Sequence, residues 1–221
     1  HLVPVQKLVQ KLGEIAVTGF SSFFVDVAMG ILTVLFNRQI MKYLDSDALA
    51  VYATVINIST FVQCCAYSVG QAAQPRHNIQ QIAGAKNAAR IRQALHLALG
   101  TSMVFAAFWT GLSELFPQLY IHIFMRPSAE ILAIAPAIIR RYSVSFVLLP
   151  VNIFSTYYFQ SILRPKDSFI VSIARGLLVS GLLIFALPAL FAPEAIWWAM
   201  PLTELVTSVY AAYAMRKSLT G

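Results

Sequence analysis

The chain has 221 residues, of which 58% are hydrophobic and only 11% are charged. A soluble domain carries about 25% charged residues, so this composition is too poor in charge to cover a water-soluble surface. The mean hydropathy of +0.70 is also the opposite of what intrinsic disorder requires. These values predict an integral membrane protein.

Charge and cysteine content exclude two further classes of protein. The net charge is +7, but the cations lie mainly in loops between apolar runs, so membrane topology accounts for them and no nucleic-acid partner is needed. Cys64 and Cys65 are adjacent and lie inside an apolar run. Two adjacent cysteines can form neither a disulfide framework nor a cysteine-based zinc site.

Six runs are long and apolar enough to be membrane-crossing helices, each of which needs about 20 such residues. These runs do not alternate in character and are too long for transmembrane strands. We therefore expect an all-α bundle of six transmembrane helices within residues 14–216, between a cytoplasmic lead-in at 1–13 and a tail at 217–221. The predicted spans cover about residues 15–37, 48–75, 93–115, 141–163, 168–191 and 195–215.

The connecting segments predict the orientation. Residues 76–93 and 127–139 are expected to form surface segments, the second as an amphipathic helix that leads into the fourth span. Of the 16 Lys and Arg residues, ten lie on the side of the N-terminus and five on the other, with Arg175 embedded. The positive-inside rule then predicts a multi-pass protein of the cell membrane with both termini in the cytoplasm.

Four polar residues are expected near the middle of the bilayer. Asp26 lies about twelve residues into the first span, which at 1.5 Å per residue is roughly 18 Å deep. Asn57 and Gln63 on the second span and Asn152 on the fourth have comparable depths. Burial penalises the charged form of an unpaired carboxyl and a bound cation favours it, so Asp26 is a candidate cation or proton site. For the three amides, interhelical hydrogen bonding is an equally good interpretation.

Two other embedded charges suggest a structural pair. Arg175 on the fifth span and Glu204 on the sixth are on antiparallel neighbours, so a salt bridge between them is feasible. Tyr157 is an aromatic candidate for the substrate site, although packing or a place in the interfacial aromatic belt is the better interpretation. We find no catalytic constellation, phosphate loop or metal-ligand spacing, and we expect neither an enzyme nor a bound cofactor or metal.

Three stretches resemble one transporter family. They are GQAAQP at residues 70–75 with AGAKN at 83–87, YFQSILRPKD at 158–167, and IWWAMPLTE at 196–204. Together, and in this order, they are similar to the C-terminal half of multidrug and toxic compound extrusion (MATE) transporters of the bacterial branch.

The resemblance implies one lobe of a twelve-helix transporter, in which two six-helix lobes open alternately to each side of the membrane. It implies export of small cationic or amphipathic molecules in exchange for H⁺ or Na⁺, with a second six-helix lobe and the lipid bilayer as partners. The acidic residue that many members carry on the first helix of this lobe matches Asp26. Some members carry a second carboxylate on the fourth helix of this lobe. The matching position here is Asn152, which is neutral, and this favours proton coupling over sodium coupling.

Other functions remain open from the sequence. A flippase of lipid-linked sugars from the same superfamily would use a more basic cavity than these helices offer. A half-transporter without its second lobe would not transport. A membrane-embedded enzyme is disfavoured because the chain has no catalytic set.

Overall fold

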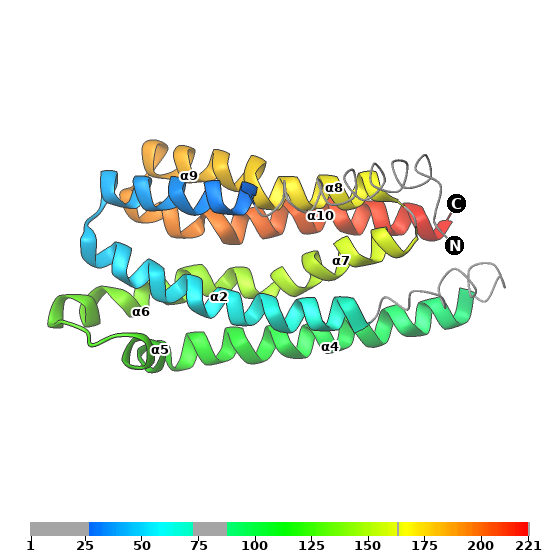
Figure 1. Cartoon of the computed structure of the whole chain (residues 1–221), viewed down its shortest axis with the longest axis horizontal. Coiled ribbons are helices and arrows are strands. Elements are labelled where there is room, and N and C mark those ends of the chain that lie inside the picture. The colour runs from blue at the N-terminus through cyan, green and yellow to red at the C-terminus, as the bar shows by residue number, and fades with distance from the viewer. Residues whose placement is uncertain (1–26, 73–87, 163, 221) are drawn as a thin grey trace, which may run out of the picture.

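The computed structural model describes residues 27–72, 88–162 and 164–220, which are almost entirely helical and contain no strand (Figure 1). They form six long helical segments, some interrupted by short irregular turns. The segments are residues 27–43; α2 (Ser46–Ala72); α4 (Ala88–Leu115); α6 (Ala129–Ser143), η1 (Val144–Val147) and α7 (Leu149–Ser161); α8 (Pro165–Ile173), η2 (Ala174–Leu178) and α9 (Val179–Leu190); and η3 (Pro193–Trp198) with α10 (Ala199–Thr220). A short helix, α5 (Pro117–Phe124), connects α4 to α6.

Local sequence signals explain where several helices begin. The Asp45 carboxylate accepts a hydrogen bond from the backbone N–H of Ala48 at 2.8 Å, so it caps α2. Ser128 caps α6 in the same way, through Ile131. Proline, whose fixed φ suits a first helical turn and whose missing N–H costs nothing there, begins α5, α8 and η3.

The long segments run up and down along one axis. The connections at residues 44–45, 116–128 and 191–192 lie at one end of the bundle, and the turn between α7 and α8 lies at the other (Figure 1). This alternation is the arrangement expected for consecutive membrane spans. The expected surface segment at 76–93 falls largely outside the described residues.

The fourth segment differs from the expectation of a surface helix followed by a separate span. Ala129–Gln160 is one helical stretch of 32 residues, in which α6 continues through η1 into α7. α6 packs against α2 and buries Ile138, Ile139 and Tyr142. The amphipathic pattern correctly predicted a helix here, but the apolar face of that helix packs against α2 rather than lying on the membrane surface.

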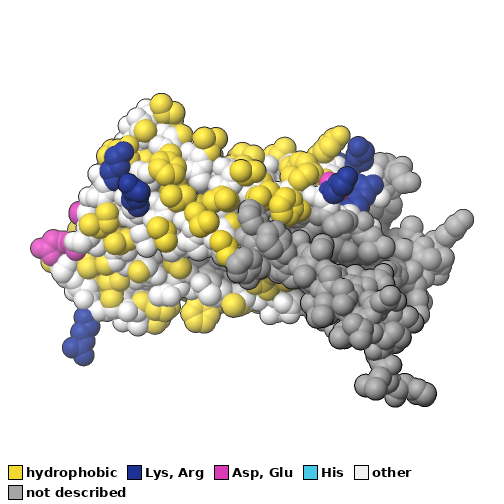
Figure 2. Space-filling model, turned by 45° about the horizontal axis from the view of Figure 1, so that its top comes forward, with side chains coloured by type: hydrophobic (Ala, Val, Ile, Leu, Met, Phe, Trp, Pro, Cys, Tyr) yellow, Lys and Arg dark blue, Asp and Glu magenta, His cyan; other side chains and the backbone are white. Residues whose placement is uncertain are grey.

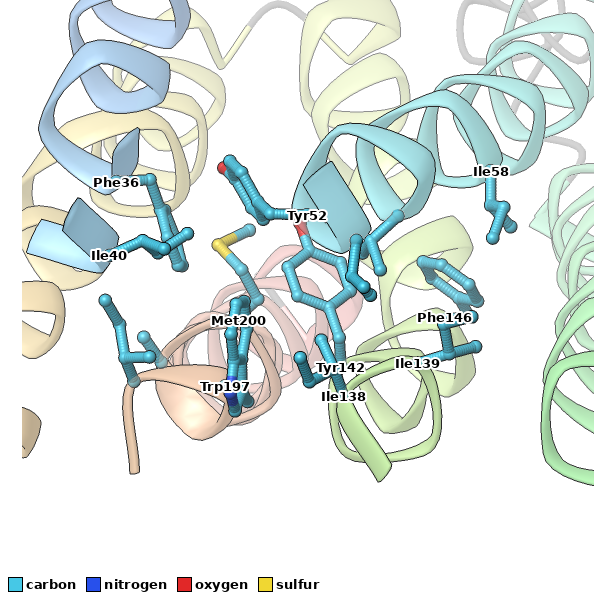
Figure 3. Close-up of a cluster of buried hydrophobic side chains, with 14 of the residues drawn as sticks. Phe36, Ile40, Tyr52, Ile58, Ile138, Ile139, Tyr142, Phe146, Trp197 and Met200 are labelled. Atoms are coloured by element: carbon cyan, nitrogen blue, oxygen red, sulfur yellow. The ribbon is translucent and has the colours of Figure 1, made fainter. Parts of the chain in front are cut away.

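The core is built from aromatic and branched side chains on the segment 27–43, α2, α6, η1, α7 and η3 (Figure 3). Phe36 stacks on Tyr52 with ring centroids 4.8 Å apart, and Tyr52 also meets Trp197 at 6.2 Å. Trp197, which is 1% exposed, is therefore part of the core rather than of an interfacial aromatic belt. This cluster fixes α2 in the middle of the bundle, where it packs against both α6 and α7.

The outer surface is apolar where lipid would contact it. Leu182 on α9 and Val209 on α10 are 68% and 66% exposed. On the face drawn in Figure 2, hydrophobic side chains cover the middle, and Lys, Arg, Asp and Glu gather near the two ends. Three helical stretches in the described part of the chain are long and apolar enough to cross a membrane, namely Ser46–Ala72, Ala129–Gln160 and Lys166–Leu190. The chain is an all-α membrane protein.

Candidate functional site

Glu204 carries a carboxylate in the centre of the bundle. Its side chain is 0% exposed, and the Arg175 Nε lies 2.6 Å from its Oε1. The Asn152 Nδ2 donates to the Glu204 Oε2 at 2.6 Å and lies 2.9 Å from the Glu204 carbonyl oxygen. Both carboxylate oxygens therefore have donors, as a buried charge requires.

The contacts extend from Glu204 on α10 to three other helical elements. Ser208, one turn further along α10, donates to the Asn152 Oδ1 at 2.9 Å, so the amide is satisfied at both ends. Tyr67 on α2 interacts with the Arg175 guanidinium. We call Glu204, Arg175, Asn152, Ser208 and Tyr67 the Glu204 network. It ties α2, α7, η2 and α10 together at one level.

Two of the helices that contribute to the Glu204 network are irregular beside it. Pro150, at the start of α7, has no N–H to donate. The backbone just before it forms the 3₁₀ turn η1, and Asn152 lies in the first turn of α7. Arg175 lies in η2, a π-helical turn within the fifth segment. Such π-bulges are rare in proteins, and many of those that are known lie at functional sites.

The salt bridge between Arg175 and Glu204, which the sequence made feasible, is present with near-complete burial of both side chains. Whether its role is only structural stays a prediction. Asn152 was grouped with Asp26 on the basis of depth, whereas its side chain here bonds to α10. Its place in a cation site also stays a prediction.

The remaining polar candidates lie in different surroundings. Asp26 is outside the described residues. Asn57 is exposed on α2, and Gln63 is half-buried and donates to the Ser59 hydroxyl at 3.2 Å. Asn57, Gln63 and Asn152 therefore do not form one cluster in the described structure, because the three side chains leave their helices in different directions.

Tyr157 is held tightly against α2. A Cβ placed on Gly70 would lie 2.3 Å from the Tyr157 Cδ2, so only glycine allows this ring to approach the helix. Gln71 Nε2 donates to the Tyr157 hydroxyl at 3.5 Å, and the Tyr67 ring meets Tyr157 edge-on at 6.2 Å. The Gly-Gln pair of the motif at residues 70–75 therefore positions an aromatic side chain.

The exposed face of α2 is more polar than the exposed faces of α9 and α10. It carries Asn57, Thr60, Cys64, Ser68 and Gln71, which follow one another at intervals of three or four residues, with the exposed aromatic rings of Phe61 and Tyr67 beside them. We call these five residues the α2 stripe. By contrast, the exposed side chains of α9 and α10 include Leu182, Phe185, Leu205, Val206 and Val209.

Sequence reasoning missed the contact between Asn152 and Glu204 and did not foresee two further members of the Glu204 network, Ser208 and Tyr67. The depth of Asn152 matches that of Glu204, since both lie about three turns from the same end of their spans, and this signal could have placed them together. Ser208 and Tyr67 had no signal of their own, because serine and tyrosine are common in such helices. Within the described residues, no group of three His, Cys, Asp or Glu side chains could hold a metal ion.

The chain matches the MatE family over residues 21–185. The chain belongs to this family, whose members are membrane transporters rather than enzymes. No curated protein sequence matches it.

Solved structures agree with this assignment. An outward-facing multidrug resistance MATE family transporter of the MOP superfamily superimposes with a TM-score of 0.79 at 17% identity, covering 95% of this chain and 47% of that one. A MATE structure in the bent conformation gives a TM-score of 0.79 at 16% identity over 99% of this chain and 47% of that one. A MATE complex with MaD3S gives 0.78 at 17% identity, covering 99% and 48%. The chain thus spans about half the length of the solved structures that it matches, which is the size of one lobe.

Proposed function

We propose that this chain is the C-terminal lobe of an antiporter that exports cationic or amphipathic organic molecules in exchange for H⁺ or Na⁺. Membership of the MatE family carries the proposal. The coverage of about half of each related structure supports the assignment of one lobe, which a second six-helix lobe would complete.

The α2 stripe supports a water-facing surface on this lobe. Asn57 and Gln71 expose amide side chains on a helix whose length and hydropathy suit a membrane span. An amide exposed to hydrocarbon would lose its hydrogen bonds with water, so such groups usually face a cavity or another helix. In the proposed transporter, this face borders the substrate passage between the two lobes.

The proposed exchange depends on Asp26, with Asn57, Gln63, Asn152 and Tyr157 as further candidates for contacts with substrate or ion. A cationic substrate and the coupling ion compete for the Asp26 carboxylate. Neutralisation of Asp26 weakens its hold on the substrate and allows the carrier to reset. One charge that moves through 100 mV supplies about 2.3 kcal/mol, which is enough for roughly fifty-fold accumulation.

Replacing Asp26 with asparagine tests this proposal. Asp26→Asn keeps the size of the side chain and removes its charge, so efflux of a fluorescent organic cation from cells should fall to the level of cells without the protein. Expression and membrane insertion should be unchanged. Asp47→Asn, the same chemical change in the first turn of α2, is the matched control and should retain efflux. Normal efflux by Asp26→Asn would refute the role of this carboxylate.

Coupling is measured separately in liposomes that contain the purified protein. Substrate-stimulated proton movement under an imposed pH gradient supports proton antiport, and dependence on a Na⁺ gradient supports sodium antiport. Absence of both, with substrate bound but not moved, would identify a lobe that does not transport without its partner.

The two cysteines test whether the α2 stripe faces water. Cys64 is exposed on the stripe, and its neighbour Cys65 is half-buried on another face. We expect the Cys65→Ser protein, which keeps Cys64, to react several-fold faster with a membrane-impermeant maleimide than the Cys64→Ser protein. Equal and slow reaction of both would place the stripe against lipid or buried protein.

A further inference from the structure

A cavity lies at the end of the bundle where α4 ends and α5 begins. It has a volume of about 450 Å³, and none of its lining residues belongs to the Glu204 network. Its lining residues are Leu115, Phe116, Pro117, Gln118, Leu119, Pro136 and Arg140. The third predicted span ends at Leu115, so the cavity lies at the level where hydrocarbon meets lipid headgroups.

The walls of this cavity are held in place by local contacts. α5 packs against α4 and α6, and its Tyr120 is buried with its hydroxyl 3.5 Å from the Ser113 hydroxyl. Ser128 caps the start of α6, which carries Pro136 and Arg140. The cavity is therefore preformed, as small-molecule sites usually are.

One wall of the cavity is strongly apolar although it is open to the outside. Leu115, Phe116 and Leu119 are 71%, 57% and 47% exposed. Three large neighbouring apolar side chains beside a cavity suit an acyl chain better than water, because removing their surface from water is favourable.

The opposite wall provides a cation. The Arg140 Nε donates to the Glu114 carbonyl oxygen at 3.0 Å, which anchors the guanidinium over the last turn of α4. Within the described residues Arg140 makes no ion pair, and the Glu114 carboxylate instead accepts a hydrogen bond from the Ser143 hydroxyl at 3.0 Å. The Arg140 guanidinium is therefore not paired with a carboxylate of the described residues.

We propose that this cavity binds an anionic phospholipid, with the headgroup phosphate at Arg140 and an acyl chain against Leu115, Phe116 and Leu119. The guanidinium is the side chain best suited to bind phosphate, because its planar set of N–H donors matches the phosphate oxygens. A phospholipid is the one ligand with both chemistries that is always present at this depth.

The test measures lipid bound to the purified protein by native mass spectrometry. The protein is titrated with phosphatidylglycerol, with phosphatidylcholine and with inorganic phosphate. We expect tighter binding of phosphatidylglycerol than of phosphatidylcholine. Arg140→Gln should weaken phosphatidylglycerol binding by about tenfold, since one charge-assisted contact is lost. Arg140→Lys keeps the charge and should retain most of the binding.

Two further variants make the result decisive. Arg126→Gln removes an exposed arginine from the loop between α5 and α6 that does not line the cavity, and it should leave binding unchanged. Phe116→Gln leaves the Arg140–Glu114 hydrogen bond intact and should also weaken lipid binding. The proposal is overturned by equal losses in Arg126→Gln and Arg140→Gln, by unchanged binding in Phe116→Gln, by no preference for phosphatidylglycerol, or by inorganic phosphate that binds as tightly as the lipid.

Discussion

Replacing Glu204 with alanine is expected to lower the free energy of unfolding by about 3–5 kcal/mol, the cost of breaking a buried ion pair. The Arg175 guanidinium, which is only 12% exposed, would be left without a counter-charge. The Asn152 Nδ2 would lose its carboxylate acceptor. Unfolding of the purified protein in mixed micelles with increasing SDS measures the change.

The partner variants separate the ion pair from simple packing. Arg175→Met combined with Glu204→Leu removes both charges, so we expect it to recover much of the stability that each single change loses. Exchanging the two charges, as Arg175→Glu with Glu204→Arg, should likewise be more stable than either single exchange. A double variant no more stable than the single ones would show that the two charges are not coupled.

An exposed pair in the same chain is the control for this experiment. Arg164 Nη1 lies 3.9 Å from Asp167 Oδ2 at the turn between α7 and α8, where the two side chains are 38% and 25% exposed. Arg164→Gln should cost at most about 1 kcal/mol because water screens such a pair. If Glu204→Ala lowered the free energy of unfolding by no more than Arg164→Gln does, water would have to reach the Glu204 carboxylate. The carboxylate would then not be buried as the structure has it.

Gly70→Ala is expected to destabilise the protein by about 1–3 kcal/mol through overpacking. The new methyl group would meet the Tyr157 Cδ2 at 2.3 Å and the Cε2 at 2.8 Å, so the ring must move away from α2. The ring also holds a hydrogen bond from Gln71, which opposes that movement. The free-energy cost of moving the ring outweighs the gain of about 1 kcal/mol that alanine normally brings over glycine in a helix interior. SDS unfolding again provides the measurement.

The sign of this effect should reverse when the ring is absent. In a Tyr157→Ala background, Gly70→Ala has no clash with the ring and should stabilise the protein by up to about 1 kcal/mol. Gly100→Ala on α4 is the matched control, because a Cβ there meets nothing within 4 Å, and it should not destabilise. Destabilisation of the same size in both backgrounds would show that Tyr157 is not the reason for glycine at position 70.

The candidate site could be predicted only in part. Arg175 and Glu204 could be paired because a tight turn makes their helices neighbours and because a long arginine side chain tolerates error in depth. Asn57, Gln63 and Asn152 were grouped by depth alone. Depth follows from counting residues, whereas the direction of a side chain changes by about 100° per residue, so equal depth does not imply contact.

Composition and the length of its apolar runs determined by themselves that this chain is a helical membrane protein, because only long uncharged helices satisfy their backbone groups within a bilayer. Capping residues and prolines determined where several helices begin. Only the tertiary structure decided that Asn152 turns towards Glu204, that Tyr157 lies on Gly70 and that Asn57 stays exposed. Rotation about each helix axis depends on how all the neighbouring helices pack, and no local pattern in the sequence encodes that.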